Sequence, residues 1–136
     1  MKRRLIAAAL VLIFPFGMAA CGSQSKAAAC HEIDNAAASA STQAQKNGQT
    51  TSRDPKVLRD RMADLTSTYK KASKKVTNKK VKPAFNNLIA DLEKFRDLAD
   101  KDSSDVSTED FQVLQDISTH GQELNDICGF KWDSGK

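Results

Sequence analysis

The stretch Asp54–Val76, DPKVLRDRMADLTSTYKKASKKV, has the most regular pattern in the chain and decides its fold. Asp54 supplies a carboxylate for a helix N-cap, and Pro55 stands at the first helical position, where its missing N–H is harmless. Apolar side chains then recur at alternating intervals of four and three residues. They are Leu58, Met62, Leu65, Tyr69, Ala72 and Val76. The spacing predicts an amphipathic helix over residues 55–77 that buries one face against other helices.

The segment of residues 26–46 has the same helical spacing but a smaller apolar face. Most members of its stripe are alanine: Cys30, Ile33, Ala37, Ala40 and Ala44. Asn47 and Gly48 follow as a C-terminal stop. This helix either packs unusually close to its neighbours or is partly mobile and held at Cys30, and the small side chains favour close packing.

Two further helices are predicted in the second half of the chain. One spans residues 83–100 and begins at Pro83, because the residue before a proline disfavours the α region. Its expected inward side chains are Phe85, Leu88, Leu92, Phe95 and Ala99, with Ile89 and Leu98 beside them. The other spans residues 108–128, between a capping box that starts at Ser107 and a stop at Gly129. Its expected seam is Val113, Ile117, Leu124 and Ile127, flanked by Phe111, Leu114 and Cys128.

Four helices of this length with short connections predict an all-α fold, an antiparallel up-down-up-down four-helix bundle over residues 26–129. The composition agrees, because aromatic and β-branched residues are sparse while alanine, lysine, aspartate, leucine and glutamine are abundant. Residues 130–136 form a C-terminal tail. No internal repeat divides the chain further.

The N-terminal segment has the three parts of a bacterial secretory signal. Residues 2–4 are basic, Leu5–Phe16 is an apolar run of about 12 residues, and Met18-Ala19-Ala20-Cys21 follows. The run is shorter than the roughly 20 residues that span a bilayer as a helix. The final four residues resemble the lipobox of bacterial lipoproteins, in which an aliphatic residue and two small ones precede a cysteine.

The resemblance implies that the signal peptide, residues 1–20, is removed and that Cys21 becomes the first residue of the mature chain. Cys21 would then be thioether-linked to a diacylglyceryl group, on a short tether of residues 21–25. Two acyl chains suffice for stable attachment to a membrane. The expected location is therefore extracytoplasmic, lipid-anchored to the bacterial cell membrane. The alternative is ordinary secretion with a free thiol at Cys21.

The cysteine count favours the lipid. The chain has three cysteines, Cys21, Cys30 and Cys128, and an odd thiol outside the cytoplasm needs an explanation. If Cys21 carries lipid, the other two remain as one pair in an oxidising compartment. The bundle topology agrees, because it brings the start of the first helix and the end of the fourth to the same end. A Cys30–Cys128 disulfide that closes the bundle is therefore predicted.

The same topology separates the charges. Lysines between the second and third helices return to the lipid-bearing end: Lys70, Lys71, Lys74, Lys75, Lys79, Lys80 and Lys82. The C-terminus adds Phe130 and Trp132 there. Carboxylates gather at the far end as a possible partner-facing surface: Asp97, Asp100, Asp102, Asp105, Glu109 and Asp110. We hypothesise that the basic end contacts anionic headgroups while both aromatic rings enter the interface. In the plainer interpretation the lysines are a solvated face and Trp132 covers the end of the core.

No pattern of residues predicts catalysis or a cofactor. The chain has two histidines, His31 and His120, and His120 is followed by Glu123 in the reverse of a di-iron motif. We expect His120 to be a satisfied histidine at the core edge. No haem attachment motif, nucleophile motif or phosphate-binding loop is present. The mature charge, about +1 once basic residues 2–4 are removed, gives no support to nucleic-acid binding.

The expected function is that of a non-catalytic interaction or envelope-associated accessory module, anchored to the membrane by lipid and contacting a protein partner. Two alternatives remain open at this point. In one, the bundle binds a small apolar molecule beside the alanine-rich first helix, with His120 lining the pocket. In the other, the protein is a secreted toxin or inhibitor, released from the membrane.

Overall fold

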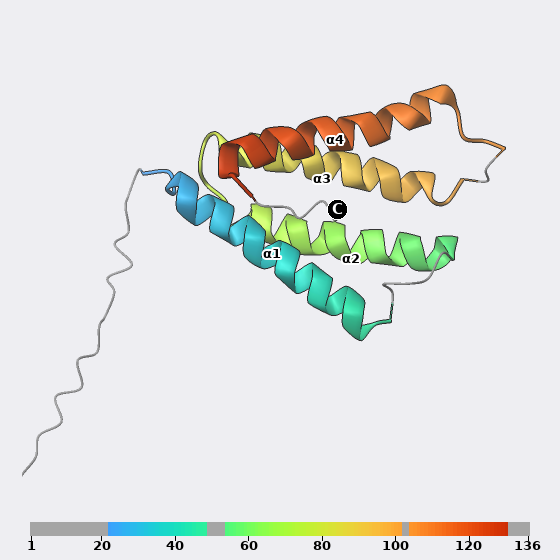
Figure 1. The fold of residues 1–136 in the computed structure, drawn as a ribbon, viewed down its shortest axis with the longest axis horizontal. Helices are drawn as coiled ribbons and strands as arrows, with labels where there is room; N and C mark the ends of the chain where they lie inside the picture. The colour runs from blue at the N-terminus through green and yellow to red at the C-terminus, as the bar shows by residue number, and fades with distance from the viewer. Residues whose placement is uncertain (1–21, 49–53, 102–103, 131–136) are drawn as a thin grey trace, which may run out of the picture.

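The computed structural model describes residues 22–48, 54–101 and 104–130, and the regular structure in these ranges is entirely helical. Four helices follow one another in the chain (Figure 1). They are α1 (Lys26–Lys46), α2 (Pro55–Ser73), α3 (Val81–Leu98) and α4 (Thr108–Cys128). Each helix packs against the next, and α1 also meets α3 and α4. The predicted all-α four-helix bundle is confirmed.

The helix ends follow their local capping signals. The Asp54 side chain accepts the Lys56 N–H at 2.9 Å, and Pro55 occupies the first turn of α2. Ser107 and Asp110 form a reciprocal capping box at the start of α4. Gly129 ends α4 with φ +68°, in the left-handed region that glycine enters without a Cβ penalty. The observed bounds of α1 and α4 equal the predicted ones.

The connection between α2 and α3 differs from the prediction. Helix α2 ends at Ser73 rather than at residue 77, and α3 begins at Val81 rather than at Pro83. The cause is Asn78, whose side-chain oxygen accepts the backbone N–H groups of Lys80 and Val81 and so starts the helix early. Pro83 is then the third helical residue, still in the first turn, where no intrahelical partner for its nitrogen is needed.

The end of α3 is also earlier than predicted. The helix stops at Leu98 instead of residue 100, and the chain continues in tighter turns. There the N–H of Asp100 donates to the carbonyl of Asp97, and the N–H of Lys101 donates to that of Leu98. Three-residue bonds of this kind commonly close the last turn of a helix.

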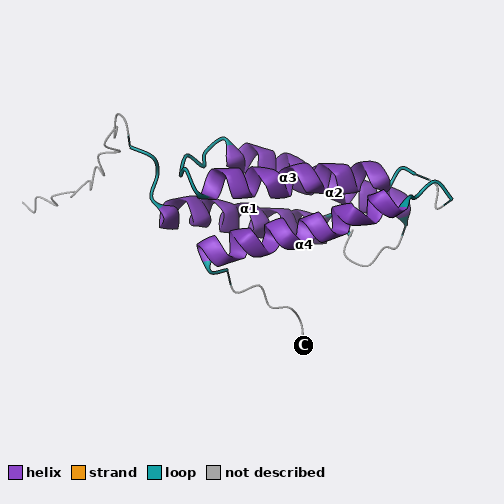
Figure 2. Ribbon diagram, turned by 90° about the horizontal axis from the view of Figure 1, so that it is seen from above, coloured by secondary structure: helices purple, strands orange, loops and turns teal. Residues whose placement is uncertain are grey.

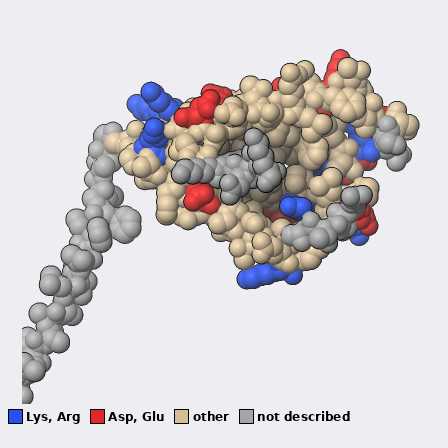
Figure 3. Space-filling model, viewed as in Figure 1, with Lys and Arg blue, Asp and Glu red and all other residues tan. Residues whose placement is uncertain are grey.

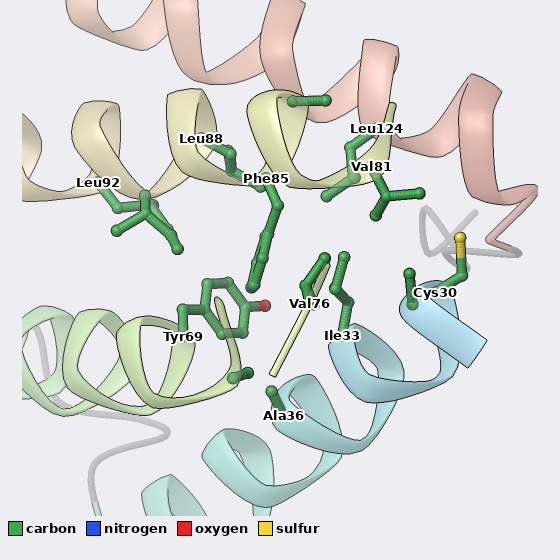
Figure 4. Packing of buried hydrophobic residues seen from close by; sticks show 14 residues of the cluster. Cys30, Ile33, Ala36, Tyr69, Val76, Val81, Phe85, Leu88, Leu92 and Leu124 are labelled. Carbon is green, nitrogen blue, oxygen red and sulfur yellow. The ribbon is translucent and has the colours of Figure 1, made fainter. Parts of the chain in front are cut away.

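The hydrophobic core lies toward one end of the bundle, where α1 and α3 begin and α2 and α4 finish (Figure 4). The rings of Tyr69 and Phe85 meet near its centre with centroids 5.3 Å apart. The buried cluster comprises Ala29, Cys30, Ile33, Ala36, Tyr69, Ala72, Val76, Val81, Ala84, Phe85, Leu88, Ile89, Leu92 and Leu124. Val76 belongs to it although α2 has already ended.

The buried face of α1 is rotated relative to the predicted stripe. Ala29 and Ala36 are buried, whereas Ala37 and Ala40 are only half-buried. The reason is that α1 packs chiefly on α2 and meets α4 near the disulfide. Beyond that point α1 diverges from α4 toward Lys46 (Figure 1). Alanine side chains let the first half of α1 approach its neighbours closely.

The opposite half of the bundle is more open than the sequence predicts. Phe111 is 61% exposed and Leu114 48% exposed, although both flank the predicted seam of α4. Leu58, predicted to point inward from α2, is 37% exposed. Of the predicted α4 seam, Leu124 alone is fully buried. The divergence of α1 leaves these side chains without the fourth helix that would cover them (Figure 2).

Candidate functional site

A disulfide joins the beginning of the fold to its end. Cys30, in the second turn of α1, is bonded to Cys128, the last residue of α4, with their Cα atoms 5.5 Å apart. The predicted pairing is confirmed. The bond brings the residues that precede α1 and those that follow α4 to one end of the bundle, the end that contains the core.

A second connection at this end involves Gln24, in the segment before α1. Its backbone N–H donates to Thr77 Oγ1 at 3.0 Å, and the Thr77 N–H donates to Gln24 Oε1 at 3.2 Å. Asn78 Nδ2 donates to the Gln24 carbonyl at 2.9 Å. These three hydrogen bonds, which we call the Gln24 clamp, hold the segment that leads to α1 against the α2–α3 connection.

The clamp places a lysine-rich segment beside the start of the fold. Four exposed lysines lie in the α2–α3 connection, and we call them the basic loop: Lys74, Lys75, Lys79 and Lys80. Lys71 precedes the loop at the end of α2, and Lys82, half-buried, follows it in α3. Lysine and arginine side chains are visible at this end of the molecule in Figure 3.

Some of the predicted membrane-facing lysines have partners within the chain. Lys70 forms an ion pair with Glu93, so its charge is already compensated. Lys75 lies 4.0 Å from Glu32, a long contact between exposed groups that is worth little. Within the described ranges, Lys71, Lys74, Lys79, Lys80 and Lys82 form no ion pair.

The two aromatic residues proposed for the interface have different positions. Phe130 is half-buried and packs against the core cluster. This packing argues against its insertion into a membrane, because the ring already contributes to the core. Trp132 lies outside the described residues.

The predicted acidic surface lies at the opposite end and is partly neutralised. Three of its carboxylates form ion pairs: Asp97 with Arg96, Asp100 with Arg59 at 2.7 Å, and Asp110 with Lys101 at 3.0 Å. The backbone N–H of Ser107 and the Lys101 ammonium hold the pKa of Asp110 below its ordinary value. Asp105 and Glu109 are exposed and form no ion pair among the described residues. Asp102 falls outside those residues.

His120 is satisfied at the core edge, by a buried carboxylate. Its Nδ1 bonds to Asp91 on α3, which is 2% exposed, and Lys94 Nζ lies 3.4 Å from the other Asp91 oxygen. Sequence reasoning missed Asp91. The signal was available, because an aspartate between Leu88 and Leu92 on an apolar face requires a buried partner.

The described part of the chain offers little else for chemistry. His31 is exposed and bonds to Asn35 on its own helix. Within the described ranges, no three His, Cys, Asp or Glu side chains are grouped so that they could hold a metal ion. No helix in those ranges combines the length and the apolar character that membrane spanning requires.

A cavity of about 220 Å³ lies beside the alanine-rich helix, between α1 and α2. Its lining comprises Ala37, Ala40, Ser41, Ala44, Arg61, Met62, Asp64 and Leu65. His120 is not part of this lining, since it pairs with Asp91 between α3 and α4. The volume is below the roughly 300–1,000 Å³ of typical ligand pockets.

Comparison with known proteins identifies no relative. The chain matches no protein-family model, no curated protein and no solved structure. Its function must therefore be inferred from its own residues: the N-terminal motif, the disulfide, the Gln24 clamp and the distribution of charge.

Proposed function

We propose that this protein is a lipid-anchored, extracytoplasmic lipoprotein whose helical bundle acts as a non-catalytic interaction module of the bacterial envelope. The Cys30–Cys128 disulfide is the observation that carries the proposal. Disulfides persist in oxidising compartments outside the cytoplasm. Because the bond uses two of the three cysteines in the chain, Cys21 in the lipobox-like Met18-Ala19-Ala20-Cys21 is left for the lipid.

The Gln24 clamp supports this arrangement. Three residues separate Gln24 from Cys21, so the chain between them spans at most about 10 Å. An acyl group on Cys21 would therefore hold the disulfide-bearing end near the membrane. The opposite end, with exposed Asp105 and Glu109, would face away from it and is where we place the contact with a protein partner.

The non-catalytic assignment agrees with how the polar side chains are used. The Asp91–His120 pair connects α3 to α4 and leaves Asp91 almost without solvent contact. Cys30 and Cys128 are bonded to each other and cannot act as nucleophiles. Each group that could have served in catalysis thus has a structural partner.

Replacing Cys21 with alanine is expected to abolish acylation and to release the protein from the membrane fraction, because the thioether has no other site in the motif. Metabolic labelling with an alkyne fatty acid and mass spectrometry of the N-terminal peptide would measure this. The matched control is Cys30→Ser/Cys128→Ser, which should keep the label. An unlabelled native protein, or a label that survives Cys21→Ala, would overturn the anchoring proposal.

The partner contact is tested by photo-crosslinking in cells. A photoreactive residue in place of Glu109 at the exposed start of α4 should give a discrete protein adduct, because this end faces away from the membrane. The control is the same residue in place of Gln122, exposed in the second half of the same helix. Identical adduct patterns from both positions, or no adduct from Glu109, would contradict a partner at this end.

A further inference from the structure

We propose that the bundle binds anionic phospholipid headgroups through the basic loop, as a second membrane attachment beside the lipid. This inference rests on the proposed function, since it takes the disulfide-bearing end to be the membrane-proximal one. It concerns the loop of Lys74, Lys75, Lys79 and Lys80 and commits to one partner, the anionic surface of a bilayer.

The first observation is the distance that the Gln24 clamp imposes. Gln24 bonds directly to Thr77 and Asn78, the two residues between the lysine pairs of the basic loop. The loop therefore lies about as close to Cys21 as Gln24 does, within roughly 10 Å of it along an extended chain. That distance is comparable with the Debye length of about 8–10 Å at physiological salt. The lysines of the loop would thus act on the headgroups without full screening.

The second observation is the availability of the charge. All four loop lysines are exposed, and Glu32 is the one carboxylate within ion-pair distance of any of them among the described residues. That contact, to Lys75 at 4.0 Å, joins side chains that are 71% and 33% exposed. Lys74, Lys79 and Lys80 therefore keep their full charge for an external anion. Lys70, by contrast, is engaged with Glu93 and is not assigned to the patch.

A third observation concerns how the loop is held. Asn78 accepts from the N–H groups of Lys80 and Val81 while its amide donates to Gln24. Val76 and Val81 on either side are fully buried. The loop is thus fixed between two buried anchors, so binding need not pay for ordering it. A lone acyl chain gives marginal attachment, and a polybasic patch is a common second signal.

The test uses the mature chain, residues 21–136, with Cys21→Ala, which retains the whole core cluster and the disulfide but carries no lipid. Co-sedimentation is measured with vesicles of phosphatidylcholine alone and of an equimolar phosphatidylcholine and phosphatidylglycerol mixture. Because a lysine near an anionic surface contributes about fivefold to binding, Lys79→Glu/Lys80→Glu should lower the partition coefficient on anionic vesicles by roughly 30-fold or more. The matched control, Lys46→Glu/Lys56→Glu, makes the same charge change at the opposite end.

Binding to the anionic vesicles that weakens with salt, is lost in Lys79→Glu/Lys80→Glu and is retained in the control supports the proposal. Equal binding to both kinds of vesicle overturns it, as does no binding to either. An equal loss in both variants also overturns it, because net charge rather than the basic loop would then be responsible. Failure here is distinct from failure of the anchoring proposal, which depends on acylation of Cys21 and is measured on the native protein.

Discussion

Replacing both Cys30 and Cys128 with serine is expected to lower the free energy of unfolding by about 2–5 kcal/mol, the range for loss of a native disulfide. The bond closes a loop with a sequence separation of 98 residues. In the chain-entropy view, a loop of that length corresponds to about 4.7 kcal/mol, near the upper end of the range. Denaturant unfolding followed by circular dichroism would measure the difference between the variant and the native chain.

The loss should be concentrated in α1. This helix buries mostly alanine, and away from the disulfide it has little contact with α4. Hydrogen exchange should therefore show a larger loss of protection in α1 than in α3, whose buried residues include Phe85 and Leu88. A uniform loss along the chain, or a change below about 1 kcal/mol, would contradict the proposed role of the bond.

Replacing His120 with alanine is expected to destabilise the fold by about 3 kcal/mol. The reason is that Asp91 would remain buried with only the exposed Lys94 beside it, and an uncompensated buried charge is costly. We take the lower end of the known range of about 3–5 kcal/mol because the His120 side chain is itself 29% exposed. Chemical denaturation measures this change, with exposed His31→Ala as a control that should stay within about 0.5 kcal/mol of the native chain.

A double variant separates the cost of the orphaned charge from the loss of packing. Asp91→Leu/His120→Leu removes both partners and should recover most of the lost stability, because apolar replacements of buried ion pairs are often neutral or stabilising. If the double variant is as unstable as the sum of the two single changes, the side chains act independently and the pair is not the source of the effect.

Local signals in the sequence were sufficient for most helix ends. The Asp54-Pro55 start, the Ser107 capping box and the Gly129 stop each depend on a few neighbouring residues, and each forms as predicted. The α2–α3 connection is local too, but there two rules compete. The rule for the residue before Pro83 was outweighed by Asn78, whose side chain caps the helix two residues earlier.

The register of α1 could not be read from periodicity. Ala36, Ala37 and Ala40 are chemically identical, so the choice of the buried face depends on which helix α1 packs against. Packing on α2 favours Ala36, whereas the predicted stripe would suit a groove shared with α4. The same missing information explains the exposure of Phe111 and Leu114, because their predicted burial assumed a bundle closed along its whole length.

The candidate site was predicted in outline. The disulfide followed from the cysteine count together with the bundle topology. The Gln24 clamp joins residues 53 and 54 positions apart through polar side chains that have no periodic pattern, so no spacing rule could find it. The pairing of some lysines and aspartates with opposite charges is equally invisible in sequence, because it depends on which helix faces meet.

The position of the disulfide also decides how the molecule carries mechanical load. Tension applied between Gly22 and Gly129 follows the covalent path through Cys30 and Cys128, and residues 31–127 lie outside that path. Pulling on the two ends of the described chain would stretch a few residues at one edge while the helices remain unloaded. Under oxidising conditions the fold is therefore protected from being unravelled from its ends.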